Sequence, residues 1–134
     1  MVAVSTPWAS QRLVDPVAEL ANRLQAEVLV VHVSRPSGGQ IREQEQADGE
    51  SAVRLLSEKL QERGAAVQTL LMFSDDIARA ILNTAAEREI TLIVLGLTGK
   101  NIFARLLAGN VPVELIKNTK IPVILLPPDW NKPL

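Results

Sequence analysis

The chain has 134 residues, 47% of them hydrophobic and 22% charged, and its formal net charge is −1. This length predicts one domain with a substantial core, while the near-zero charge and the four aromatic residues (two Trp, two Phe) argue against nucleic-acid binding. No cysteine is present, which excludes disulfides and thiolate chemistry. No apolar run reaches the roughly 20 residues of a membrane-spanning helix and no signal peptide is recognisable, so we expect a cytoplasmic location without membrane insertion.

Strands and helices are predicted to alternate strictly along the chain. In order, we expect a strand over 1–5, a helix over about 7–24, a strand over 27–33, a helix over about 41–63, a strand over 67–73, a helix over about 77–85, a strand over 90–95, a helix from about 111, and a strand over 121–126. The end signals agree: Thr6-Pro7 starts a helix and Gly64 stops one. This order predicts a single α/β domain, with a parallel sheet and right-handed crossovers that place helices on both faces.

Three glycines follow the fourth predicted strand. Gly96 ends the apolar run, Gly99 comes three residues later, and Gly109 precedes a helical pattern. Glycine lets the backbone adopt positive φ or lets a ligand approach closely, and free amides at a helix start favour an anion. The spacing Gly-x2-Gly-x9-Gly therefore predicts a phosphate cradle at the carboxyl end of the sheet.

This glycine pattern resembles the nucleotide-binding signature of the universal stress protein family, in which a Ser or Thr follows the last glycine; here Asn110 takes that place. The resemblance extends from the first predicted strand to residue 126. It implies an adenine nucleotide alpha hydrolase-like fold with strand order 3-2-1-4-5. It also implies a domain over 1–128, followed by a polar tail over 129–134.

The resemblance further implies a bound adenine nucleotide: ATP, with or without Mg²⁺, or AMP. Gly96 would admit the ribose or triphosphate, and the amides of Gly99 and Gly109 would contact phosphate. Lys100 is either a phosphate contact or a solvated loop charge, and Asn110 is either a phosphate contact or a helix cap. The expected binding residues are Ser5, Val33, Leu95, Gly96, Gly99, Lys100, Gly109, Asn110 and Val111.

One position departs from the family pattern. Nucleotide-binding members carry Asp at the end of the first strand, where it contacts the adenine side of the ligand, and the matching residue here is Ser5. Losing that charge weakens base selection, at about 1–2 kcal/mol for one hydrogen bond to a charged group. A member that no longer binds nucleotide therefore remains an open alternative.

We identify no catalytic or metal-binding residues. His32, the one histidine, is interpreted as a satisfied core residue, because no serine or cysteine nucleophile is positioned with it. Asp75 and Asp76 read as helix caps, and the acidic stretch 43–50 reads as a solvated helix face. Gly99-Lys100-Asn101 lacks the spacing and the hydroxyl of a Walker A motif, so the chain is at most a slow ATPase.

Three functions follow from the resemblance. The first is a nucleotide-binding stress-response module that acts as a homodimer through the fifth strand, Ile121–Leu126. The second is a cytoplasmic regulatory domain of a membrane cation transporter or antiporter. The third is a domain that works by protein contacts alone.

Overall fold

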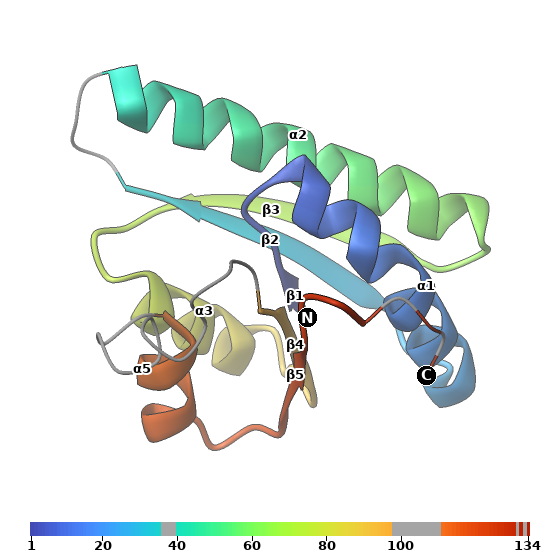
Figure 1. Ribbon diagram of the computed structural model, residues 1–134. Coiled ribbons are helices and arrows are strands. Elements are labelled where there is room, and N and C mark those ends of the chain that lie inside the picture. The colour runs from blue at the N-terminus through green and yellow to red at the C-terminus, as the bar shows by residue number, and fades with distance from the viewer. Residues whose placement is uncertain (36–39, 98–110, 131, 133) are drawn as a thin grey trace.

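A computed structural model describes the backbone of residues 1–35, 40–97, 111–130, 132 and 134. It contains a five-stranded parallel sheet in the order β3-β2-β1-β4-β5, with helices on both faces (Figure 1). The predicted fold class and strand order are therefore confirmed. The elements are β1 (Val2–Ala3), α1 (Pro7–Leu24), β2 (Val28–Ser34), α2 (Gln40–Glu62), β3 (Val67–Phe73), α3 (Ile77–Glu87), β4 (Ile93–Gly96), α5 (Val111–Asn118) and β5 (Val123–Leu126).

Three strands are shorter than predicted, and one of them is β5, which begins at Val123 rather than at residue 121. β1 comprises only Val2–Ala3, although the extended backbone continues far enough for Val4 N to donate to Val31 O at 2.9 Å. β4 begins at Ile93 rather than at residue 90, because Ile90 N donates to Ala85 O at 2.9 Å and so completes the end of α3. In all three cases the hydrophobic sequence extends beyond the residues assigned to the strand.

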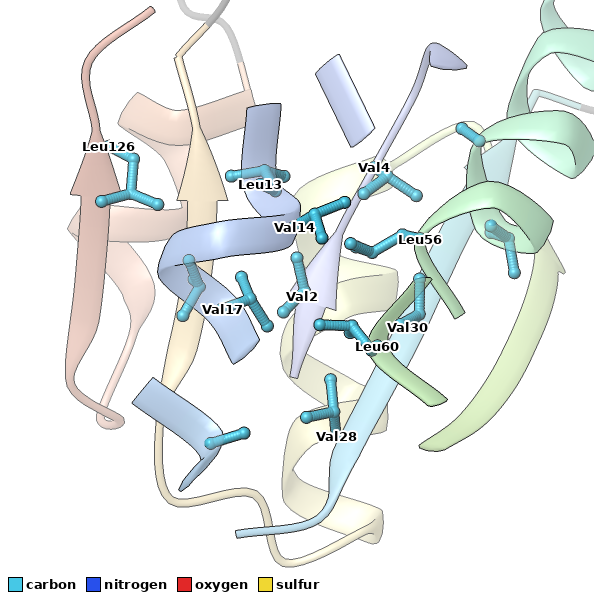
Figure 2. Close-up of a cluster of buried hydrophobic side chains, with 14 residues drawn as sticks. Val2, Val4, Leu13, Val14, Val17, Val28, Val30, Leu56, Leu60 and Leu126 are labelled. Carbon is cyan, nitrogen blue, oxygen red and sulfur yellow. The ribbon is translucent and has the colours of Figure 1, made fainter. Parts of the chain in front are cut away.

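Two apolar layers enclose the sheet. β2 is buried along its whole length, and its side chains alternate between the layers. Val28 and Val30 pack with α1 and α2, whereas Leu29 and Val31 pack with α3 and α5. Figure 2 shows the first layer, in which Leu56 and Leu60 of α2 approach Val30. A strand buried on both faces needs no alternation of polar residues, which accounts for the apolar run from Val28 to Val31.

Three helices end with the same pair of hydrogen bonds. After α2, Gly64 has φ +86°, its amide donates to Gln61 O, and Ala65 N donates to Leu60 O. This is the Schellman arrangement, which needs a left-handed residue just past the helix. Gln25 after α1 (φ 50°) and Glu89 after α3 (φ 54°) occupy that position without being glycine. The prediction from sequence found only the glycine case.

Candidate functional site

The candidate site lies at the carboxyl edge of the sheet, between β1 and β4. These two strands are neighbours at the centre, with Ala3 opposite Leu95. The chain leaves β1 toward α1 on one face, whereas α5, which precedes β5, lies on the other face (Figure 1). Ligands of open α/β sheets bind where connections diverge in this way.

The β1 side of this crevice is a helix entry. Ser5 is exposed, and the next residue, Thr6, is the N-cap of α1, its hydroxyl oxygen accepting from Ala9 N at 3.2 Å. Pro7 occupies the first helical position, where no backbone donor is needed. Ser5 is therefore held at the edge of the sheet with its side chain available to solvent.

The β4 side is the end of the strand at Gly96. A Cβ at this position would lie 3.2 Å from Leu13 Cδ2, so the glycine lets α1 approach β4 closely. Leu97 N then donates to Leu126 O at 2.8 Å, which fixes the chain as it leaves the sheet. The remaining predicted loop residues, Gly99, Lys100, Gly109 and Asn110, lie outside the described residues.

Three predicted wall residues belong to the core cluster on the α3 and α5 face. Val33 is 7% exposed and Leu95 5%, and Val111 at the start of α5 packs against the same cluster. The structure thus brings the backbones of β2, β4 and α5 to one edge together with Ser5. The Val33 and Leu95 side chains point into the core from that edge.

A contact that sequence reasoning missed holds the end of β1 in place. His32 of β2 is buried, and its Nδ1 donates to Val4 O at 2.8 Å, one residue before Ser5. The other ring nitrogen, Nε2, has no hydrogen-bond partner among the described residues, so the histidine is in the core, as expected, but only half satisfied. A Cβ on Gly49 of α2 would lie 2.1 Å from this ring. A glycine in mid-helix was the signal available in the sequence.

A cavity of about 510 Å³ lies at the amino-terminal edge of the sheet, opposite the candidate site. Its apolar wall comes from α1, including Val17, Leu20 and Leu24, while Arg88 and Glu89 follow α3. The Met1 α-amino group also lines it, donating to Leu92 O at 2.9 Å, and burial lowers the pKa of this amine to about 6. This cavity shares no residue with the candidate site.

The described part of the chain contains no cluster of three or more His, Cys, Asp or Glu residues that would hold a metal ion. Within the same residues, no helix combines the length and hydrophobicity required to cross a bilayer. The arrangement at the carboxyl edge is a strand-end crevice with a hydroxyl, backbone groups and a helix entry, which suits binding of a polar ligand.

Comparison with known proteins places this fold in a family. The family model for the universal stress protein family matches residues 1–127. Universal stress protein YxiE of Bacillus subtilis (strain 168) is 24% identical, over 94% of this chain and 96% of that protein. Sensor protein KdpD of Mycobacterium tuberculosis (strain ATCC 25618 / H37Rv) is 32% identical over 87% of this chain, which spans only 13% of KdpD.

Solved structures agree with the sequence match. A universal stress protein in complex with cAMP superposes with a TM-score of 0.70 at 20% identity, over 93% of this chain and 94% of that one. A universal stress protein from Archaeoglobus fulgidus in complex with dAMP gives a TM-score of 0.67 at 22% identity, over 92% and 93%. The sheet order, the match of the family model to residues 1–127 and the shared fold all indicate the same family. The chain belongs to the universal stress protein family.

Proposed function

We propose that this protein is a regulatory module that binds an adenine nucleotide, with ATP as the ligand, at the carboxyl edge between β1 and β4. The observation that carries the proposal is the convergence of Ser5, Gly96 and the start of α5 on one sheet edge. Two solved family members are described as complexes with cAMP and dAMP, which supports an adenine nucleotide as the ligand class.

In this proposal the backbone does most of the binding. Gly96, Gly99 and Gly109 let phosphate oxygens approach main-chain amides, with Lys100 and Asn110 beside them, and Mg²⁺ is held mainly by the phosphates and water. Ser5 offers one neutral hydrogen bond on the adenine side. Val33, Leu95 and Val111 support that wall from the core. The protein is cytoplasmic and pairs through β5.

A second function has its own support in the KdpD match, because this chain is similar to a small part of a much longer sensor protein. Here the same nucleotide-binding domain regulates a membrane system, either as part of a larger chain or as its partner. The length of the natural gene product separates this proposal from a free-standing module.

The test of nucleotide binding uses Trp8 as a reporter. Trp8 lies in the first turn of α1, three residues after Ser5, and is 54% exposed. In a Trp130→Phe variant, Trp8 is the only tryptophan, so titration with Mg-ATP should change its fluorescence with a saturable dependence.

The matched variant is Ser5→Asp in the same background. A carboxylate accepting from the adenine edge should tighten binding about 5- to 30-fold, on the scale of 1–2 kcal/mol for a charged hydrogen bond. Saturable binding that Ser5→Asp leaves unchanged would place the nucleotide elsewhere. No saturation by ATP, AMP or cAMP in either protein would support the contact-only alternative.

A further inference from the structure

Arg12 of α1 is fixed by two contacts near the carboxyl edge of the sheet. Its guanidinium carbon lies 4.5 Å from the centroid of the Trp8 ring, and its Nη1 donates to Pro128 O in the segment after β5. Helical side chains extend toward the helix N-terminus, so the guanidinium lies at the level of the first turn of α1. The charged group is therefore close to the ends of the strands. Arg12 was not among the binding residues expected from the sequence.

Arg12 shares a small hollow with the end of β4. Gly96 and Leu97 line this hollow together with Arg12, and Pro128 and Trp130 line it from the segment after β5. That segment turns back toward α1 (Figure 1), where Trp130 packs against the layer formed by α1 and α2. Arg12 thus lies beside the backbone that leaves β4, which is where the proposed phosphate site begins.

The charge of Arg12 has no counter-charge in the described part of the chain. Arg12 is half-buried, and none of the ion pairs among the described residues includes it. Asp129 follows Pro128 but is exposed and forms no ion pair with Arg12. The first turn of α1 has no acidic residue, and the helix dipole adds positive potential there. An anionic group that binds at this place is stabilised by both sources of positive potential.

The two contacts of Arg12 leave its guanidinium able to bind phosphate. The Trp8 ring covers one face of the planar group, whereas the N–H donors lie in the plane. Pro128 O is the one hydrogen-bond acceptor that the described residues provide to these donors. Stacking on Trp8 also fixes the orientation of the group, so less side-chain entropy is lost when it makes a bidentate contact with phosphate.

We propose that Arg12 binds the terminal phosphates of the nucleotide and so makes the site prefer a triphosphate to a monophosphate. This inference rests on the nucleotide site proposed above. In that site the base lies at Ser5, which follows β1, and the ribose lies at Gly96, which ends β4. Since the strand order is β1-β4-β5, the phosphate chain continues from Gly96 toward the end of β5. Arg12 is held at this end by Pro128, so it meets the outer phosphates rather than the first.

Calorimetric titrations with Mg-ATP and with AMP test this role, and the wild type should bind ATP more tightly than AMP. Arg12→Gln removes the charge but keeps an amide that is able to donate to Pro128 O. It should weaken ATP binding about 10- to 100-fold, the scale of a hydrogen bond to a charged group, and leave AMP binding nearly unchanged. Arg12→Lys keeps the charge without the planar group and should recover part of the preference for ATP.

Arg23→Gln is the matched control. Arg23 lies in the last turn of the same helix, in an ion pair with Glu19, so this variant loses the same charge far from the site and should bind both ligands as the wild type does. If the wild type binds neither ATP nor AMP, the nucleotide site is wrong and the role of Arg12 fails with it. If both bind and Arg12→Gln weakens them equally or not at all, the site stands and the role of Arg12 is overturned. Equal weakening is the result expected if Arg12 only anchors the segment after β5 to α1.

Inorganic tripolyphosphate tests the same contact without the base. In the Trp130→Phe background, the guanidinium stacks on the one remaining tryptophan, so tripolyphosphate should change Trp8 fluorescence with a saturable dependence. Arg12→Gln should abolish this change, and Arg23→Gln should leave it as it is. A signal that does not change, or the same titration curve in Arg12→Gln, would contradict a phosphate contact at Arg12. Circular dichroism must show each variant folded, and if Arg12→Gln does not fold, a wild-type preference for ATP over AMP in Arg12→Lys would overturn the inference.

Discussion

At the scale of single residues, the contact between His32 and Gly49 links the core to the candidate site. The ring fills the space where a side chain on α2 would lie, and its Nδ1 donates to Val4 O, next to Ser5. A glycine inside a helix costs about 1 kcal/mol relative to alanine, and here the gain is a close approach between α2 and β2. This contact sets the position of the β1 end from which Ser5 projects.

The effect of Gly49→Ala on the free energy of unfolding should therefore change sign when His32 is removed. In the wild type, Gly49→Ala forces a methyl group into the His32 ring and should lower the free energy of unfolding by about 1–3 kcal/mol. In a His32→Ala background, the same change should raise it by up to about 1 kcal/mol, because helix propensity alone remains. Urea unfolding of the four proteins measures both values.

The control for this cycle is Ser51→Ala, two residues along α2, which should be neutral or slightly stabilising in both backgrounds. A destabilisation by Gly49→Ala of the same size with and without His32 would mean that the ring is not what requires glycine.

At the scale of elements, the helix ends show where local sequence determines structure and where it does not. Thr6 and Asp76 cap α1 and α3 through side-chain oxygens that accept from Ala9 N and Arg79 N. Both were predicted from residue type. The positive φ angles of Gln25 and Glu89 were not predicted, because glutamine and glutamate have no preference for that conformation. Their conformation is imposed by the strand that must begin shortly afterwards.

Glycine at these two positions should stabilise the protein. Gln25→Gly and Glu89→Gly each remove the strain of a left-handed side chain, and each should raise the free energy of unfolding by about 0.5–1 kcal/mol. The melting temperature should rise by about 2–4 °C for each change. Differential scanning calorimetry measures the shift.

Gly64→Ala provides the reciprocal control. Gly64 holds the same position after α2 at φ +86°, with open space around it, so a methyl group adds strain without a clash. The loss should be about 1 kcal/mol. If the glycine and non-glycine forms at these three sites had the same free energy of unfolding, the shared Schellman ending would be contradicted.

Prediction from sequence was strongest for elements and weakest for long-range contacts. Continuous apolar runs and glycine or proline punctuation predicted the alternating order of the nine strands and helices that the structure describes, and β3 was predicted with its observed bounds. The strand order came from family resemblance, since periodicity does not specify which strands are neighbours. The Gly49–His32 contact joins residues 17 positions apart on different elements. No local pattern encodes such a contact.

The position of the candidate site could be predicted from the sequence, but the directions of its side chains could not. Position at the carboxyl edge follows from the alternation of strands and helices, and the structure places Ser5 and Gly96 there. The side-chain directions of Val33 and Leu95 did not follow from sequence. Both faces of β2 and β4 are buried, so an apolar side chain on these strands could lie on either face.

At the scale of the whole molecule, the parallel sheet has a carboxyl edge and two outer strands, β3 and β5. The carboxyl edge carries the proposed nucleotide site and the β5 edge the proposed pairing, while β3 at the other edge exposes Leu71 and Phe73. The central strands β1 and β4 connect the candidate site with β5, because β1 ends at the candidate site and β4 pairs with β1 and with β5. Ligand binding at the carboxyl edge is the central claim.

The measurement that tests this claim most directly is titration calorimetry with Mg-ATP on the wild type and on Gly109→Val. We expect micromolar binding to the wild type, about −8 kcal/mol, and at least a hundredfold loss in the variant, whose side chain would block phosphate from the amides. Circular dichroism must show the variant folded. Absence of heat up to millimolar ATP, or equal binding by both proteins, would contradict a nucleotide site at the glycine loop.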